Sequence, residues 1–545
     1  MIWRRWKGVC IVMKEQKKIG LFQIVMLALG ALIGSGWLFG SWEATKVAGP
    51  AAIISWVIGA IVIGVIAYNY VELGTMFPQS GGMSKYAQIT HGSLLGFMAA
   101  WANWVSLIAL IPIEAIAAVQ YMSSWPWSWA SWTHGFFNNT KLTVTGYVAV
   151  IIFILIFTLL NYWSVNLLTR FTSFISVFKI GIPVLVIVMF TMSGFHPENY
   201  GQSISEFMPY GTSPIFAATT VAGIIFSFNA FQTVINMGSE IKKPERNIGL
   251  GIAISLGITT VLYVILQSTY ITSLDPAFIA EHGWHGINFQ SPFADLATLL
   301  GLHWLSVLLY MDAFVSPFGT GVSFAATASR TLAAMVSNNH MPKFLGKIND
   351  QYGIPRIAMA VNAILSVILV LIFPSWTALA SVISTSTLIA YLTGPVSVMS
   401  LRKDGKDLRR PFKGKLMPVM APLAFILASL ATYWAMFPTT LEVIVVIILG
   451  LPFYFFYEKK LGYPNTKKAF KSSAWMLAYL PFISLISYIG SHEFNGLNWI
   501  HYPWDFVVII IASLFFYNWG VRTSFQGRYF NEAVELNKTV VLEDD

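Results

Sequence analysis

The chain has 545 residues, of which 56% are hydrophobic and 10% are charged, whereas soluble proteins carry about 25% charged residues. This composition indicates a membrane protein and excludes an ordinary soluble domain. A single cysteine excludes an internal disulfide and a cysteine metal cage. The nine histidines show no paired spacing inside apolar stretches, so we expect no metal and no cofactor.

Apolar stretches of about 20 residues, which are long enough to cross the hydrocarbon layer, recur along the chain. We identify about fourteen of them, and because a few are short we expect 12 to 14 crossings. The stretches lie near residues 20–42, 50–74, 93–121, 145–162, 171–193, 214–238, 248–273, 297–329, 357–374, 377–400, 418–437, 440–457, 474–491 and 504–521.

The distribution of basic residues predicts the orientation. With a cytoplasmic N-terminus, all but three of the 33 Lys and Arg residues fall in inner segments; Lys46 and Lys141 lie in outer loops and Lys179 lies inside a span. This bias obeys the positive-inside rule and predicts an even number of crossings, with both termini in the cytoplasm. The formal charge of +9 therefore reflects topology, and no nucleic-acid partner is expected.

The ends of the chain and its basic loop fit the same topology. The basic N-terminus lacks a cleavable small-residue site, so we expect no signal peptide, and Met13 is an alternative start. The stretch 401–415 is predicted to be a cytoplasmic loop that acts as an orientation signal and touches anionic lipid. We expect a multi-pass protein of the cell (inner or plasma) membrane.

The first span carries four glycines in "LGALIGSGWLFGS" (Leu29–Ser41), although glycine costs about 1 kcal/mol in a helix interior. Gly30 and Gly34, like Gly36 and Gly40, are spaced for close helix contact. The alternative is a break of the helix at Gly34, Ser35 and Gly36. Unwound backbone at membrane depth persists only where it lines a cavity or binds something.

The sixth span concentrates polar residues in "GIIFSFNAFQTVINMGSE" (Gly223–Glu240). Ser227, Asn229, Gln232 and Thr233 lie in its middle, where polar groups are costly unless they face a cavity or one another. Hydrogen bonding between helices is one interpretation. Because inverted repeats place a second broken helix five spans after the first, the two spans together favour a binding site.

Several other spans contain ionisable residues. Lys179 lies nine residues, or about 13 Å, beyond Arg170 in the fifth span. It is either a lysine whose ammonium snorkels to the interface or a buried amine that takes up and releases a proton. Asp312 in the eighth span is either a functional carboxylate or a structural partner. Glu114 in the third span is interpreted as a wall of an outer vestibule.

Acidic residues also lie at the cytoplasmic ends of spans. Glu72 ends the second span and Glu240 ends the sixth. We predict that Glu240 forms an inner-gate network of ion pairs with Lys243 and Arg246; ordinary interfacial capping is the alternative.

Four motifs in this order and spacing resemble the amino acid–polyamine–organocation permeases over roughly residues 20–400. They are "ALIGSGWLFG", "YVELGTMFPQSGGMSKY" (Tyr70–Tyr86), "GSEIKKPERNIGLGI" (Gly238–Ile252) and "ASRTLAAMVSNNHMP" (Ala328–Pro342). The stretch "MDAFVSPFGTG" around Asp312 is similar to the bacterial aspartate–proton symporter branch. The resemblance implies an all-α polytopic fold of two inverted five-helix repeats, in which helices 1 and 6 are discontinuous.

This fold implies a division of the chain. We expect a transporter core at 20–400, built from repeats at 20–193 and 214–400. The remaining parts are a cytoplasmic N-terminus (1–19), a basic cytoplasmic loop (401–417), accessory transmembrane helices (418–521) and a cytoplasmic tail (522–545).

The resemblance also implies a substrate site. The α-carboxylate of the substrate would meet backbone N–H groups at Gly34, Ser35 and Gly36. Its α-amine would meet carbonyls near Phe226, Ser227 and Asn229, with Phe226 as an aromatic gate. The family commonly has Gly and an acidic residue where this chain has Ala230 and Gln232, which disfavours cationic substrates. The lack of an obvious arginine in the site counts against acidic ones.

Lys179 matches by position a lysine of proton-coupled relatives that stands where sodium-driven cousins bind Na⁺. Its expected neighbours are carbonyls near Gly30 and the side chains of Ser316 or Thr320, and with Asp312 these residues form the predicted proton-coupling group.

We therefore expect a secondary active transporter, and not an enzyme, that takes up a neutral or acidic amino acid with protons by alternating access. Its partners would be the amino acid, the proton and the lipid bilayer, and the sequence does not fix an oligomeric state. An exchanger without net proton coupling and a non-transporting nutrient sensor are the alternatives. A channel would need a repeated filter or a ring of like charges, and an intramembrane enzyme a nucleophile–base pair; we find neither in the sequence.

Overall fold

The computed structural model describes residues 2–6, 9–13, 19–78, 82–138, 141–163, 165–229, 231–337, 341–349, 354–460 and 466–544. In these ranges the chain is almost wholly helical. Two small antiparallel sheets accompany the helices: β1 (Ile2–Trp6) pairs with β2 (Val9–Met13), and β3 (Phe137–Asn138) pairs with β4 (Lys141–Leu142).

The helices of the N-terminal part include the first predicted break. They are α1 (Leu21–Leu32), α2 (Gly36–Ala48), α3 (Ala52–Met76), α4 (Gly82–His91), α5 (Ser93–Met122), α6 (Val144–Trp163) and α7 (Val165–Ser193). Short 3₁₀ turns occupy Gly49–Ala51, Ser128–Phe136 and Pro197–Tyr200.

The middle of the chain contains the second predicted break and a group of short helices. It comprises α8 (Ile204–Phe207), α9 (Ser213–Val221), α10 (Ile224–Ser227), α11 (Phe231–Asn236), α12 (Pro244–Ser273), α13 (Pro276–Gly286), α14 (Pro292–Leu299) and α15 (His303–Ser337). Further 3₁₀ turns lie at Gly238–Glu240 and Lys343–Gly346.

The C-terminal part continues with α16 (Arg356–Ile372), α17 (Trp376–Tyr391), α18 (Thr393–Asp404), α19 (Met417–Tyr433), α20 (Thr439–Ile448) and α21 (Leu451–Lys460). It ends with α22 (Thr466–Ile489), a 3₁₀ turn at His492–Phe494, α23 (Trp504–Thr523) and α24 (Arg528–Asp544).

Each of the fourteen predicted apolar stretches overlaps one or more of these helices, which confirms an all-α polytopic fold. Nine helices of the described chain are long and apolar enough to cross a membrane, or ten if the bent pair of α9 with α10 and α11 is one span. Several predicted spans are divided into shorter helices, such as α1 and α2, so the count of crossings stays a prediction.

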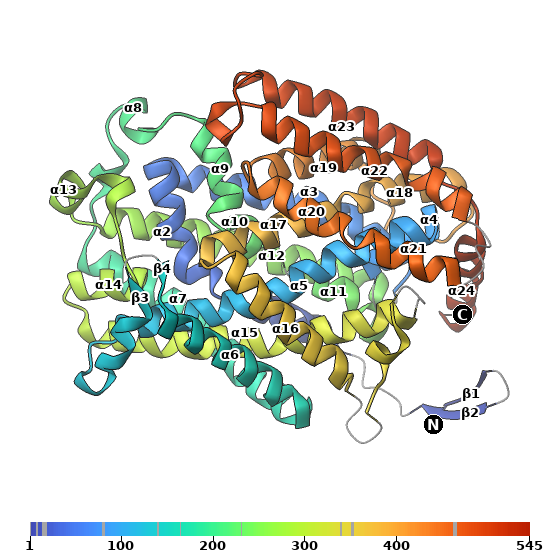
Figure 1. Cartoon of the computed structure of the whole chain (residues 1–545), viewed down its shortest axis with the longest axis horizontal. Coiled ribbons are helices and arrows are strands. Elements are labelled where there is room, and N and C mark those ends of the chain that lie inside the picture. Colours follow the sequence, from blue (N-terminus) through green and yellow to red (C-terminus); the bar gives the residue numbers. More distant parts are fainter. Residues whose placement is uncertain are drawn as a thin grey trace.

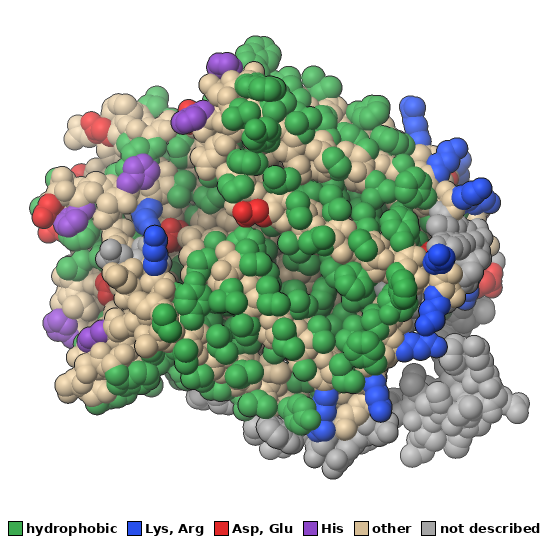
Figure 2. Space-filling view, viewed as in Figure 1, with side chains coloured by type: hydrophobic (Ala, Val, Ile, Leu, Met, Phe, Trp, Pro, Cys, Tyr) green, Lys and Arg blue, Asp and Glu red, His purple; other side chains and the backbone are tan. Residues whose placement is uncertain are grey.

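The long helices lie side by side, with α8, α13 and α14 at one end of the molecule and the β1–β2 hairpin and α24 at the other (Figure 1). Figure 2 shows most Lys and Arg side chains at the end that carries α24, His and most acidic side chains at the opposite end, and mainly hydrophobic side chains between them. The separation of charge agrees with a membrane-embedded middle. That the basic end faces the cytoplasm remains a prediction of the positive-inside rule.

Helix α5 forms the centre of the bundle. An apolar stretch of 18 residues in α5 is entirely buried, as expected for a helix that is apolar on all sides. Both α15 and α17 pack along it. The same helix carries Glu114, which is 0% exposed, so the expected position of this residue on a vestibule wall is wrong.

Candidate substrate site at two helix breaks

The first predicted break is present in the structure. α1 ends at Leu32 and α2 begins at Gly36, and Ile33 leaves the helical region with φ −90° and ψ 81°. The neighbouring glycines permit close approach: a Cβ on Gly34 would lie 2.8 Å from Glu114 Oε1, and one on Gly36 would run into Ser227 Oγ. The glycines therefore allow the broken helix to approach α5 and α10 closely.

Buried side chains bind the polar groups that this break frees. The Ser35 N–H donates to both carboxylate oxygens of Glu114, at 3.3 and 3.2 Å. Tyr263 donates its hydroxyl to Leu32 O at 2.9 Å, and Trp376 Nε1–H donates to Ser35 Oγ at 2.9 Å. The break thus holds a carboxylate near the N-terminus of α2, where the helix dipole favours negative charge.

The sixth span is interrupted as well. α9 ends at Val221, and α10 with α11 continues at an angle of 48° to it. Gly223 at this bend has φ +76°, a conformation that glycine adopts without steric cost. A Cβ there would lie 2.6 Å from the Trp376 ring. Trp376 therefore contacts both breaks.

A second interruption follows α10 at Phe228 and Asn229. Asn229 Nδ2–H donates to Thr387 Oγ1 at 2.8 Å, and Tyr391 donates its hydroxyl to Asn229 Oδ1 at 2.7 Å and to Asn229 O at 3.2 Å. Gln232 Nε2 lies 3.5 Å from Asn229 Oδ1, while Gln232 Oε1 is buried without a hydrogen-bond partner among the described residues. The polar groups around this turn are neutral.

The structure brings the two halves of the predicted substrate site together. Gly36 faces Phe226 and Ser227, and Asn229 follows two residues later in the same turn. Phe226 packs edge-on against Trp376 with ring centroids 5.8 Å apart, which places an aromatic ring beside the first break. Ala230, which stands where the family commonly has Gly, lies outside the described residues.

The four residues of the predicted proton-coupling group form one connected chain. Lys179 Nζ donates to Gly30 O at 2.9 Å and to Thr320 Oγ1. Thr320 Oγ1 donates to Ser316 O at 3.0 Å, and Ser316 Oγ donates to Asp312 Oδ1 at 3.0 Å. Asp312, Ser316 and Thr320 are four residues apart and share one face of α15.

Burial separates the two interpretations of Lys179. The lysine is 3% exposed and Asp312 is 2% exposed. The ammonium group lies at the first break and does not snorkel to the surface. Asp312 Oδ2 is buried without a hydrogen-bond partner among the described residues.

The predicted inner-gate network is not formed. Glu240 makes no ion pair with Lys243 or Arg246 among the described salt bridges, and both basic side chains are exposed. Instead, Ile19 N–H donates to Glu240 O at 2.8 Å and Lys242 N–H donates to Ile19 O at 2.9 Å. Backbone pairing thus joins the segment before α1 to the segment after α11.

A buried ion-pair cluster at the same end was missed by sequence reasoning. Arg402 donates to both oxygens of Glu72, at 2.8 and 2.5 Å, and Arg410 Nε lies 3.7 Å from Glu72 Oε1. Gly414 N–H donates to Glu72 Oε2 at 3.0 Å, and Glu72 is 0% exposed. Part of the basic loop therefore folds onto α3, which an orientation signal alone does not require.

Comparison with known proteins places the chain in a family. A sequence profile of the family described as "Amino acid permease" matches residues 19–451. The glutamate/serine transporter AimA of Bacillus subtilis (strain 168) is 49% identical over 527 residues, which cover 96% of this chain and 97% of that protein. The aspartate-proton symporter of the same organism is 33% identical over 514 residues, covering 93% and 96%.

A more distant relative is the branched-chain amino acid permease BcaP of Bacillus subtilis (strain 168), 25% identical over 458 residues, which cover 82% of this chain and 94% of that protein. The family profile spans both helix breaks and the predicted proton-coupling group. The chain belongs to the amino acid permease family and is a multi-pass membrane protein for amino-acid transport.

Proposed function

We propose that this chain takes up an acidic or small neutral amino acid together with protons, by alternating access across the cell membrane. The names of the relatives support the two parts of the proposal: the protein at 49% identity transports glutamate and serine, and the protein at 33% identity is an aspartate-proton symporter. An exchanger without net proton coupling is the second candidate.

One observation carries the proposed substrate site: a carboxylate already lies on the first break. Glu114 accepts the Ser35 N–H through both of its oxygens, so this peptide group binds the chemical group that every amino acid carries. A substrate would place its α-carboxylate on the N–H groups of Gly34, Ser35 and Gly36 and displace Glu114. Its α-amine would face the carbonyls near Phe226, Ser227 and Asn229.

The proposed coupling path begins at Lys179. Its amine contacts Gly30 O of the first broken span and Thr320 of α15, and the hydrogen bonds continue through Ser316 to Asp312. A proton that binds or leaves Lys179 therefore changes the charge next to the break that holds the substrate. The ammonium form of Lys179 at this position also opposes a sodium site.

The proposed architecture assigns the two repeats to 20–193 and 214–400. The loop 401–417 then links this core to accessory helices within 418–521, and residues 1–19 and 522–545 are cytoplasmic. Backbone pairing of Ile19 with Glu240 and Lys242 closes the cytoplasmic side of both broken spans. We propose that this pairing, in place of side-chain ion pairs, opens when the substrate is released inward.

Uptake into proteoliposomes tests the proposal. We expect labelled glutamate and serine to accumulate when the outside is made acidic, and a sodium gradient alone to drive no uptake. The substitution Lys179→Ala should abolish accumulation driven by the pH step, while Lys141→Ala, an exposed lysine of the strand β4, should leave it unchanged. Full proton-driven uptake by Lys179→Ala would remove this residue from the coupling path.

A second measurement separates symport from exchange. Symport requires net uptake into vesicles that contain no amino acid, whereas an exchanger works only when the vesicles are preloaded. Uptake that depends on preloading and ignores the pH step would favour the exchanger. Binding of amino acids without any uptake would favour the sensor.

A further inference from the structure

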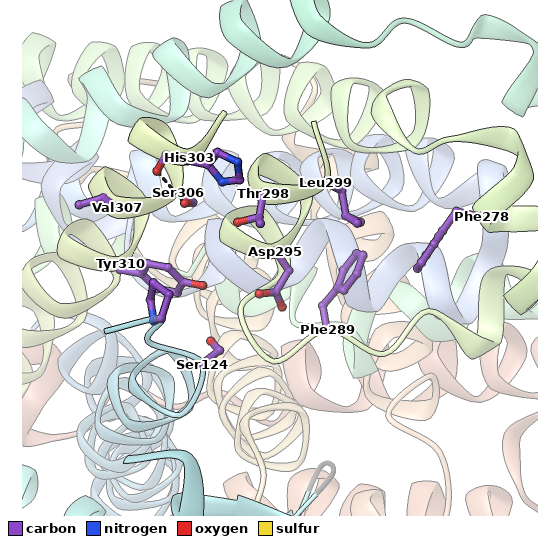
Figure 3. Close-up of a pocket in the computed structure, with 11 residues that line it drawn as sticks. Ser124, Phe278, Phe289, Asp295, Thr298, Leu299, His303, Ser306, Val307 and Tyr310 are labelled. Carbon is purple, nitrogen blue, oxygen red and sulfur yellow. Dashed lines mark hydrogen bonds between the residues drawn. The ribbon is translucent and has the colours of Figure 1, made fainter. Parts of the chain in front are cut away.

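A pocket of about 590 Å³ lies beside α14 and the start of α15 (Figure 3), and α14 lies at the end of the molecule opposite α24 (Figure 1). Small-molecule sites commonly have volumes of about 300–1,000 Å³. Residues of the loop after α5, of α13 and of the loop between α13 and α14 complete the lining. The pocket is separate from the two helix breaks, none of whose residues line it.

The chemistry of the pocket is that of a carboxylate among aromatic rings. Figure 3 shows the Asp295 carboxylate in its middle, with Phe289 beside it and Phe278 beyond. The rings of Phe278 and Phe289 are stacked with centroids 5.8 Å apart, and Tyr310 lines the opposite side. Aromatic faces attract organic cations.

Asp295 has an ordinary structural role that uses part of its hydrogen-bonding capacity. Its Oδ2 accepts the Ser291 N–H at 2.8 Å, at the start of α14. Burial raises the pKa of Asp295 to about 6, so the group is ionised at neutral pH. The lining residues include no lysine or arginine to balance this charge.

Helix α14 connects the pocket to the first broken span. Asp295, Thr298 and Leu299 of α14 line the pocket, whereas Phe293 of the same helix is 0% exposed and packs on Trp37 with centroids 5.4 Å apart. Trp37 is the second residue of α2, directly after the break at Ser35. A ligand that fixes α14 would therefore fix the contact of α14 with the first broken span.

We propose that this pocket binds a small organic ammonium compound between Asp295 and the rings of Phe278 and Phe289, and that its occupation slows transport by holding α14 against α2. The effect on transport rests on the proposed function, whereas the binding itself does not. The lining contains His303 but no lysine or arginine to meet the carboxylate of a free amino acid, which is therefore a poorer ligand than a simple amine. The ammonium group can belong to a soluble amine or to the headgroup of an amine-bearing lipid.

Binding of phenethylammonium to the purified full chain tests the site. We expect saturable binding at pH 7.5 by calorimetry, in nanodiscs of phosphatidylglycerol. Asp295→Asn should weaken the binding at least tenfold; its side-chain oxygen can still accept the Ser291 N–H. The matched control is Asp275→Asn, since Asp275 also caps an outer helix by accepting the Ala277 N–H at 2.8 Å but does not line the pocket.

Phe289→Ala provides a second variant that keeps the carboxylate and removes a ring, and it should also weaken the binding. Absence of saturable binding by the unmodified chain, or equal affinity in Asp295→Asn and the unmodified chain, would overturn the site. Nanodiscs with added phosphatidylethanolamine separate the sources of the ammonium group. If the lipid amine occupies the pocket, this lipid lowers the affinity for the probe; if only soluble amines bind, the affinity stays the same.

The effect on transport is measured separately. Phenethylammonium should lower the maximal rate of amino-acid uptake by the unmodified chain, and Asp295→Asn should resist it. Binding without inhibition would overturn the link through α14 while the site stands. If the chain took up no amino acid under any gradient, the proposed function would fail, and the calorimetric result would still decide the site.

Discussion

The two interrupted spans bind their freed backbone groups with different chemistry. At the first break, Glu114 supplies a carboxylate to Ser35 N–H, and Lys179 supplies an ammonium group to Gly30 O. At the second, Asn229 is held by the neutral side chains of Thr387 and Tyr391. Only the first of these two sets of contacts can therefore change its charge when a proton binds, although the two breaks touch each other.

This difference suggests a division of roles. The first break would sense both the substrate's carboxylate and the proton, while the second would set the shape and polarity of the site. Trp376 contacts both: its indole N–H binds Ser35 and its ring packs at Gly223. A movement at one break therefore shifts a residue that also contacts the other break.

The largest expected effect comes from a substitution that pushes the two broken spans apart. Gly36→Leu places a side chain where a Cβ already meets Ser227 and Phe226, so we expect uptake to fall at least about 100-fold, as a loss of about 2.8 kcal/mol would produce. Uptake in proteoliposomes measures it. Gly64→Leu is the matched control, because a Cβ on Gly64 meets nothing within 4 Å. Unchanged substrate affinity in Gly36→Leu would reduce the glycines to packing residues.

Removing the charge of the first break is expected to have the next largest effect. Glu114→Gln keeps an oxygen that accepts Ser35 N–H but removes the repulsion of a substrate carboxylate. Unit charges about 4 Å apart interact by about 4 kcal/mol at an effective dielectric constant of about 20. We expect amino-acid binding at pH 8 to tighten at least about tenfold. Equilibrium binding measures the change, with Glu43→Gln in the second half of α2 as control. Weaker binding would contradict the proposed displacement.

Adding a charge to the second break tests whether its neutral side chains determine the charge of the substrate. Gln232→Glu introduces a carboxylate beside Asn229, so we expect uptake of glutamate to fall about tenfold, as a loss of about 1.4 kcal/mol would produce, while uptake of serine changes much less. Competition between the two amino acids measures it, and Gln202→Glu at the surface is the control. Equal losses for both amino acids would place the substrate side chain away from this turn.

The smallest effects on transport are expected from a matched pair of tyrosines, one at each break, whose loss acts mainly on stability. Tyr263→Phe leaves Leu32 O without its hydroxyl partner, and Tyr391→Phe leaves two oxygens of Asn229 without theirs. A buried acceptor left unpaired costs about 1–3 kcal/mol, so thermal unfolding should occur earlier in both variants and earliest in Tyr391→Phe. Tyr488→Phe at the exposed surface should unfold like the unmodified chain. The reverse order of the two variants would show that the first break is the more dependent on its partner.

The sequence predicted the features that lie within one segment. Glycines at 34 and 36 marked the first break, the polar run from Ser227 to Gln232 marked the second, and the depth of Lys179 in its span placed its amine inside the bundle or at the interface. Motif resemblance supplied the pairing of distant segments. The contacts of Lys179 with Gly30 and Thr320 could therefore be predicted from the residues and their resemblance to a family.

Contacts that depend on tertiary packing were not predicted. Glu114 lies 79 residues from Ser35 and Arg402 lies 330 residues from Glu72, and neither pair leaves a periodic signal in the chain. The sequence of a basic loop does not show whether its arginines face water or a buried carboxylate. For the same reason the inner gate was assigned to ion pairs among Glu240, Lys243 and Arg246. In the structure, backbone hydrogen bonds join this segment to the segment before α1.

The ion pairs of Glu72 can form only late in the synthesis of this protein. The carboxylate belongs to α3, but both of its guanidinium partners and the Gly414 N–H are more than 300 residues further along the chain. Until the ribosome has made residue 414, a nascent chain must keep this acid hydrated or protonated at the membrane surface. A chain truncated before that point would expose it permanently, and cellular quality control would have an unpaired charge by which to recognise an unfinished transporter.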